Sequence, residues 1–236
     1  MALPDQRRAG RLVADKLTGT EIHSIRGLET LGSEHGGWLV PALDVPEGAV
    51  CYLAGVGEDI TFDLALIARF KCSVFAFDPT PRAQEHVIQH AAHLCQFRFF
   101  PVGLWDTEGV LKFYAPSNPQ DVSHSILNLK RTDKYFEAPC KRLSTLMREL
   151  GHSRLQLLKL DIEGAEYRVI DSLVEDGLDI SIICVEYHAV HNDPDHKLKK
   201  SVARLCETGY ALVAVEYDVN FTFVKSSFLS QHQVQR

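Results

Sequence analysis

Short runs of β-branched and aromatic residues alternate with amphipathic helical runs from about Val50 onward. The first pairs are a strand at 50–55 with a helix at 60–70, and a strand at 73–78 with a helix at 82–94. Strands that alternate with helices are joined by right-handed crossovers, which place helices on both faces of a mainly parallel sheet. The pattern therefore predicts an α/β fold.

The second half of the chain continues this alternation and ends differently. The expected elements are a strand at 97–104, a hairpin around 105–115, a polar loop at 116–138, a helix at 143–151, a strand at 155–161, a helix at 165–177, a strand at 180–188 and a helix at 195–209. The last two strands, 210–217 and 220–226, are joined by a link too short for a parallel crossover. We expect them to form an antiparallel hairpin at one edge of the sheet.

Residues 1–45 lack the alternation of strands and helices. A helical pattern covers about 4–17, and glycine-rich sequence follows it. We therefore expect an N-terminal extension at 1–45, partly helical, and one domain at 46–236. A chain of 236 residues is long enough to bury a single core.

Composition narrows the classes of partner. The net charge of -6 lacks the basic excess that a phosphate backbone requires, so we expect no nucleic-acid partner. No apolar run approaches the roughly 20 residues of a membrane span, and the N-terminus lacks a signal-peptide pattern. The six cysteines are scattered without a C-x-x-C pair, which is typical of reduced thiols. These features predict a cytoplasmic protein, and they leave its oligomeric state open.

The stretch CYLAGVGEDITFD, Cys51–Asp63, places Gly55 and Gly57 at the first strand-to-helix turn, where α/β sheets bind nucleotides. A dinucleotide fingerprint requires a third glycine near Ile60. The adjacent Glu58 and Asp59 would also repel a pyrophosphate, by about 1 kcal/mol or more for each close pair. The loop therefore disfavours NAD.

A ligand with a ribose, no phosphate and a cationic ammonium and sulfonium would accept nearby carboxylates, and S-adenosylmethionine is such a ligand. Asp78 follows the second strand, where an acidic side chain can accept both ribose hydroxyls. In the alternative interpretation, Gly55 and Gly57 only turn the chain and Asp78 caps the next helix.

A second acidic motif, LLKLDIEGAEYRVI at 157–170, follows a later strand. It places Asp161, Glu163 and Glu166 at the start of a helix. The helix dipole favours a carboxylate there by about 0.3–1 kcal/mol, but three around one turn exceed what capping requires. Because ligands bind beyond the ends of parallel strands, we expect Asp161 to project into the same crevice as the first loop.

These motifs resemble those of the FkbM-type S-adenosylmethionine-dependent methyltransferases. LKLDIEGAEYRVI is similar to the K-x-D-x-E-G-x-E motif of that family, and GVGEDITFDLAL and VFAFDPTP resemble its first two motifs, which methyltransferase-like proteins of the type 24 group share. PVGLWDTEG and ICVEYH extend the resemblance over about 36–225. Many members read D-x-G-A-N where this chain has Ala54 to Glu58, so Glu58 or Asp59 would have to hold the methionine ammonium.

The resemblance implies a class I methyltransferase fold, which is Rossmann-like, with seven strands in the order 3-2-1-4-5-7-6 and the seventh antiparallel. It also implies transfer of a methyl group to a hydroxyl of a small molecule or glycan. Gly55, Gly57, Glu58, Asp59 and Asp78 would then surround the cofactor.

Methyl transfer to oxygen aligns donor and acceptor and removes the hydroxyl proton. His188 ends the fifth strand on the same edge as Asp161, and we expect it to act as general base, with Asp161 and Glu163 facing the acceptor. In a further interpretation, Asp161, Glu186 and His188 hold a divalent cation, magnesium or manganese, that polarises the hydroxyl.

Two other functions compete with a methyltransferase of EC class 2.1.1. An NAD-dependent or nucleotide-sugar enzyme on a similar sheet is disfavoured by the missing third glycine and the acidic turn. A non-catalytic binding module with the same fold is supported by the altered first motif, whereas the complete motif from Asp161 to Glu166 argues against it.

Overall fold

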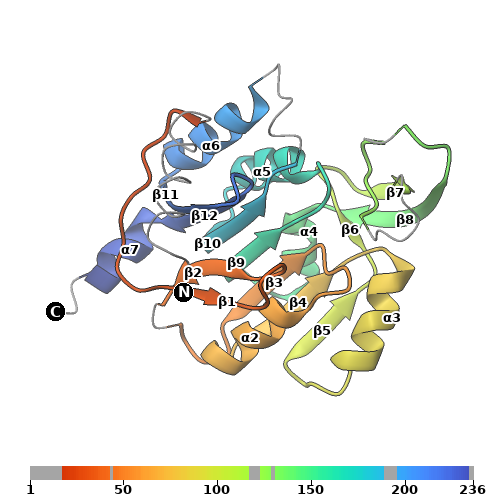
Figure 1. The fold of residues 1–236 in the computed structure, drawn as a ribbon, viewed down its shortest axis with the longest axis horizontal. Helices are drawn as coiled ribbons and strands as arrows, with labels where there is room; N and C mark the ends of the chain where they lie inside the picture. The colour runs from red at the N-terminus through yellow and green to blue at the C-terminus, as the bar shows by residue number, and fades with distance from the viewer. Residues whose placement is uncertain (1–17, 43–44, 117–122, 129–130, 189–195, 234–236) are drawn as a thin grey trace.

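The computed structural model describes residues 18–42, 45–116, 123–128, 131–188 and 196–233, and its centre is a seven-stranded sheet (Figure 1). The strands are β11 (Tyr210–Glu216), β12 (Asn220–Lys225), β10 (Asp179–Glu186), β9 (Arg154–Leu160), β3 (Val50–Ala54), β4 (Ser73–Phe77) and β5 (Phe97–Phe100), in that spatial order. β12 is antiparallel to both β10 and β11, and the other pairs are parallel. Numbered along the chain, these strands have the order 3-2-1-4-5-7-6, which confirms the expected fold.

Alternate residues of each strand face opposite sides of the sheet, and each side has its own core. On β3, Tyr52 packs with one cluster and Leu53 with the other. The first cluster includes residues of α4 (Leu143–Leu150), α5 (Glu166–Glu175) and α6 (Lys197–Glu207). The second includes residues of α2 (Thr61–Phe70), α3 (Pro81–His90) and α7 (Ser226–Gln233). Helices therefore cover both faces, as the alternating pattern predicts.

A second, three-stranded sheet differs from the prediction. It contains β6 (Gly103–Leu104), β8 (Tyr135–Lys141) and β7 (Gly109–Tyr114), with β8 in the middle. The predicted strand 97–104 is divided between β5 and β6, with Pro101, which has no amide hydrogen to donate, between them. The predicted hairpin at 105–115 is wrong, because β7 pairs with the distant β8, and the predicted polar loop at 116–138 already includes the start of that strand.

The described part of the N-terminal extension forms a β-hairpin. β1 (Leu28–Leu31) pairs antiparallel with β2 (Trp38–Pro41), and Trp38 is buried in the second core, where its ring lies 6.4 Å from that of Phe62. The Leu39 amide donates to Glu216 Oε2 at 2.9 Å, and the Leu39 carbonyl accepts from Thr222 at 2.9 Å. The predicted helix at 4–17 lies outside the described residues, and the division at residue 45 stays a prediction. Among the described helices, none has the length and apolar character needed to cross a membrane.

Candidate functional site

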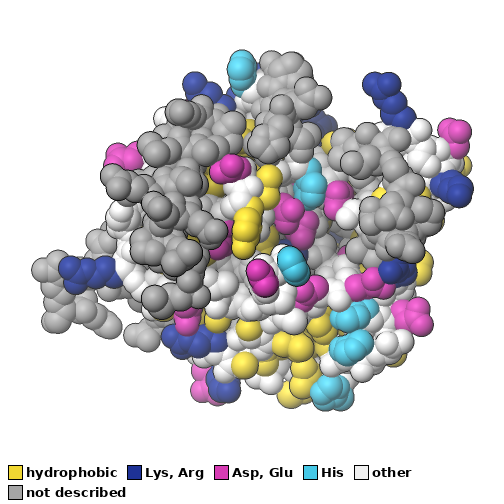
Figure 2. Space-filling model, viewed as in Figure 1, with side chains coloured by type: hydrophobic (Ala, Val, Ile, Leu, Met, Phe, Trp, Pro, Cys, Tyr) yellow, Lys and Arg dark blue, Asp and Glu magenta, His cyan; other side chains and the backbone are white. Residues whose placement is uncertain are grey.

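A cavity of about 240 Å³ opens at the edge where the parallel strands end. The loops after β3, β4 and β9 contribute Gly55, Val56, Gly57, Glu58, Asp59, Asp78, Asp161 and Glu163, and β10 contributes its last residue, Glu186. The β1–β2 turn and the three-stranded sheet add apolar and polar groups around them. β3 lies between β4 and β9, where the strand order reverses, which is the usual ligand position in such sheets. Figure 2 shows acidic and histidine side chains gathered near the middle of this face, over the ends of β9 and β10.

Gly55 holds the first loop against the second motif. Its φ of +83° lies in the left-handed region, and a Cβ at this position would overlap the backbone oxygen of Asp161. The Asp161 amide also donates to the Ala54 carbonyl at 3.1 Å. The glycine is therefore required by contact between two loops of the protein itself, which the sequence did not reveal.

Asp78 organises the same loop. Its Oδ2 accepts hydrogen bonds from the amides of Val56, at 2.9 Å, and Gly57, at 3.0 Å. Its Oδ1 accepts from the amide and hydroxyl of Thr80, and Thr80 provides the N-cap of α3. Asp78 is buried and lines the cavity. It thus supports the glycine turn and does not cap the helix directly, while its contact with a ribose stays a prediction.

Glu58 and Asp59 both line the cavity, and each has a partner within the protein. Glu58 forms a two-point ion pair with Arg82, at 3.0 and 2.6 Å. Asp59 accepts hydrogen bonds from Ser33 at 2.6 Å and from Thr61. Burial opposes ionisation of Asp59, but the hydrogen bonds from Ser33 and Thr61 outweigh it and lower the pKa. The β1–β2 turn therefore contributes to the site, a role that the extension's sequence did not indicate.

Lys159 connects the two motifs from inside the sheet. Its ammonium donates to the Gly55 carbonyl at 2.7 Å and to Asp161 Oδ2 at 3.0 Å, and the side chain is buried. Asp63, on α2, is buried nearby, and burial raises its pKa to about 7 although the charge of Lys159 acts in the opposite direction. The ammonium of Lys159 thus holds Asp161 at the rim of the cavity.

Glu166 fixes the loop that carries Glu163. Its side chain is 0% exposed, and its Oε1 accepts from the amides of Ile162 and Gly164, at 2.9 and 3.2 Å. Glu163 has a φ of +53° in this tight turn. The final glutamate of the acidic motif therefore organises the site from behind and does not line the cavity.

His188 lies between carboxylates. Its Nδ1 is 2.8 Å from Glu166 Oε1, and its Nε2 is 3.4 Å from Glu163 Oε2 and 4.0 Å from Glu186 Oε1. Burial lowers the pKa of His188, but the hydrogen bond to Glu166 and the nearby carboxylates reverse the effect and raise the pKa to about 10. With this pKa, His188 is an imidazolium ion at neutral pH, with a proton on each ring nitrogen. It can act as the expected general base only after one of these two protons has left.

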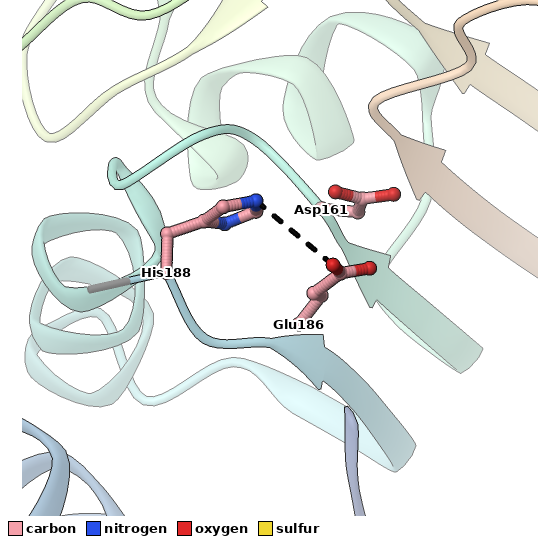
Figure 3. A group of neighbouring side chains, drawn as sticks. All are labelled: Asp161, Glu186 and His188. Carbon is pink, nitrogen blue, oxygen red and sulfur yellow. Dashed lines mark ion pairs between the residues drawn. The ribbon is translucent and has the colours of Figure 1, made fainter. Parts of the chain in front are cut away.

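Glu186 reaches the cavity directly, whereas His188 is not among the residues that line it. Burial, with repulsion from Asp161, raises the pKa of Glu186 to about 7. The oxygen and nitrogen atoms of Asp161, Glu186 and His188 that can bind a metal all lie within 4.8 Å of one another. Figure 3 shows the three side chains converging from the ends of β9 and β10. The structure thus brings together the residues of the expected acceptor site and of the alternative metal site.

The seven-stranded sheet and the acidic cavity at its switch point define a protein of the class I methyltransferase type. Residues 54–212, more than half of the chain, match the family described as the methyltransferase FkbM domain. The chain therefore belongs to the FkbM methyltransferase domain family.

Individual relatives are more distant. The chain is 30% identical over 134 residues to the 2-O-methyltransferase NoeI of Sinorhizobium fredii (strain NBRC 101917 / NGR234). The matched region covers 50% of this chain and 55% of NoeI. It is 27% identical over 139 residues to the probable methyltransferase-like protein 24 of Rattus norvegicus, covering 58% of this chain and 32% of that protein. Among solved structures, the fibrillarin pre-rRNA processing protein of Methanococcus jannaschii is similar with a TM-score of 0.46 at 9% identity, covering 86% of this chain and 85% of that one. The chain thus spans about half or less of the length of these two curated relatives.

Proposed function

We propose that this protein transfers a methyl group from S-adenosylmethionine to a hydroxyl of a small molecule or sugar. One observation carries the proposal: the cavity at the switch point is lined by carboxylates, and Lys159, the only lysine or arginine among its described lining residues, already binds Asp161 and Gly55. Such a lining repels a pyrophosphate and attracts a sulfonium and an ammonium. The same observation disfavours the alternative NAD or nucleotide-sugar enzyme.

The residues present fit this cofactor. Asp78 lines the cavity, and because its two oxygens already accept four hydrogen bonds from Val56, Gly57 and Thr80, a ribose hydroxyl would share or replace one of these donors. Phe77 and Leu104 give the cavity apolar surface. Glu58 or Asp59 would attract the methionine ammonium, since both line the cavity. When bound, the cofactor supplies an activated methyl group on sulfur.

The protein's contribution to the transfer is alignment and removal of a proton. The acceptor hydroxyl would lie against Asp161, Glu163 and Glu186, at the end of the cavity formed by β9 and β10, with His188 behind these carboxylates. A carboxylate of this group, Glu163 or Glu186, is the better proton acceptor, because His188 already holds a proton. His188 would then orient and balance the carboxylates as a cation.

An oxygen acceptor is favoured because one relative, NoeI, is named a 2-O-methyltransferase. Phe113 of β7 and Ile126, in a turn between β7 and β8, contribute to the cavity wall, and apolar groups of this kind suit the face of a sugar ring. A cytoplasmic location and the absence of a nucleic-acid or membrane partner remain expectations from composition. The six cysteines are all unpaired, in agreement with a reducing compartment.

Calorimetry with S-adenosylmethionine, S-adenosylhomocysteine and NAD tests the proposal. We expect S-adenosylmethionine and S-adenosylhomocysteine to bind and NAD to show no heat of binding. Binding of NAD alone would support the nucleotide enzyme, and the absence of binding by either S-adenosyl compound would refute a methyltransferase. If S-adenosylhomocysteine binds but no hydroxyl acceptor is methylated in a screen of sugars and phenols, the non-catalytic module becomes the better account.

A further inference from the structure

We propose that Asp161, Glu186 and His188 form a binding site for one divalent cation, manganese or magnesium, at the acceptor end of the cavity. The use of the cation in methyl transfer depends on the proposed function, but its binding does not.

The three side chains come from the ends of two adjacent, paired strands. β9 and β10 run parallel, with Leu160 opposite Val185, so Asp161 and Glu186 each directly follow a residue fixed by the sheet. Six ligands at about 2.1 Å from one ion lie roughly 3–4.2 Å apart. The candidate atoms lie within 4.8 Å of one another, so small side-chain rotations suffice to close them around an ion.

The imidazole of His188 is oriented as in many metal sites. Its Nδ1 is held by Glu166 Oε1 at 2.8 Å, which leaves Nε2 directed toward Glu163 and Glu186. Metal-binding histidines usually have their second ring nitrogen bound to a carboxylate in this way, which fixes the ring and makes it a stronger ligand. Glu166 is not itself a candidate ligand, so this contact is independent of the cluster.

Glu166 gives a further sign of an unbalanced charge. Its side chain is fully buried, and its Oε2 has no hydrogen-bond partner within the described parts of the chain. A buried carboxylate oxygen without a partner is costly. A metal ion on the far side of the His188 ring would polarise the ring and strengthen its bond to Glu166 Oε1, which offsets part of the charge that Oε2 shares with it.

The local charge also favours a cation. Among the described residues, the ion-pair partners of these four carboxylates, Asp161, Glu163, Glu166 and Glu186, are Lys159 and His188. A metal that binds His188 Nε2 displaces the proton that makes this ring a cation, so the ion itself replaces that positive charge. Two carboxylates with one imidazole suit manganese or magnesium better than zinc, which prefers nitrogen and sulfur ligands. The sulfonium of the cofactor would offset part of the same charge, so metal binding is measured in the absence of S-adenosylmethionine.

Such an ion would act on the acceptor. A hydroxyl oxygen bound to it loses its proton more readily, and Glu163, which is not among the three ligands, is placed to receive that proton. The carbon–sulfur bond of the donor breaks as the new carbon–oxygen bond forms. The products are the methyl ether and S-adenosylhomocysteine, and no oxidant or reductant is required.

The test is direct manganese binding to the full chain after treatment with a chelator, measured by electron paramagnetic resonance and calorimetry. We expect one ion per chain in the wild type, with the affinity reduced at least tenfold in Glu186→Gln and in His188→Gln. Glu207→Gln, an exposed change of the same type on α6, is the control and should bind as the wild type does. Circular dichroism and S-adenosylhomocysteine binding confirm that each variant is folded.

Absence of manganese binding at millimolar concentration, with S-adenosylhomocysteine still bound, would overturn the metal site and leave the proposed function intact. Binding that is equal in wild type, Glu186→Gln and His188→Gln would also overturn it. The reverse result, manganese bound at this site and no S-adenosyl compound bound, would support the metal site while refuting the proposed function.

Discussion

The backbone oxygen of Asp161 occupies the space that a side chain at Gly55 would need. The two residues belong to different motifs, one after β3 and one after β9, and Lys159 joins them again through the Gly55 carbonyl and the Asp161 carboxylate. The cofactor loop and the acceptor loop therefore form one rigid unit at the switch point. A change in either residue should affect both halves of the site.

Gly55→Ala should destabilise the protein and abolish binding of S-adenosylhomocysteine. The left-handed backbone costs about 1–2 kcal/mol for a residue with a Cβ, and the overlap with Asp161 adds about 1–3 kcal/mol. Urea unfolding measures the loss. Gly48→Ala is a matched control, because Gly48 has a similar φ of +75° and open space around it. Equal losses in the two variants would contradict the role of the contact with Asp161.

Asp78→Ala should weaken binding of S-adenosylhomocysteine by about 1.5–3 kcal/mol, because both the ribose contact and the support of the Val56 and Gly57 amides are lost. Calorimetry measures the change. Thr80→Val removes the hydroxyl bond to Asp78 but retains the carboxylate, and should have a smaller effect. An unchanged affinity in Asp78→Ala would refute its assignment to the cofactor.

Lys159→Met should lower the free energy of unfolding by about 2–4 kcal/mol, because it leaves the Asp161 carboxylate without its buried partner. Asp161 is partly exposed, and water can solvate its charge in the variant, so we expect a loss near the lower end of this range. Lys225→Met removes an exposed pair with Asp179 and should cost no more than about 1 kcal/mol. Chemical denaturation at neutral pH compares the two variants. Similar losses would show that the buried ammonium has no special role.

Glu166→Gln should lower the pKa of His188 in the metal-free protein, because the carboxylate that stabilises the imidazolium is removed. The folded pKa of about 10 lies above the ordinary value of about 6.5, so the folded state binds the proton more tightly than the unfolded state. This contribution to stability is therefore complete below about pH 6.5 and is lost as the pH rises through about 10.

NMR titration of the His188 ring and unfolding experiments from pH 6 to pH 10 measure both effects. The alkaline loss of stability should be smaller in Glu166→Gln than in the wild type. A pKa of His188 that stays near its ordinary value in the wild type would contradict the arrangement of carboxylates around the ring.

The seven strands of the main sheet could be predicted because each has a strong apolar run and because the short link between β11 and β12 requires a hairpin. The three-stranded sheet could not, since β8 is half exposed and pairs with β7 across a long separation in sequence. Asp161, Glu186 and His188 were predicted to meet because neighbouring parallel strands end at the same edge. The sequence did not predict that Glu166 binds the Ile162 amide or that Ser33 binds Asp59. Both contacts depend on how the loops fold back on one another, and the spacing of residues in the motifs does not indicate this.

The β1–β2 hairpin has a practical meaning for the boundaries of the domain. Its turn binds Asp59 through the Ser33 hydroxyl. Its second strand is hydrogen-bonded to Glu216 of β11 and Thr222 of β12, and its Trp38 ring packs near that of Phe62. A fragment that starts at residue 46 would expose this apolar surface and release the cofactor loop. A shortened chain suited to crystallisation or binding studies should therefore begin before Leu28.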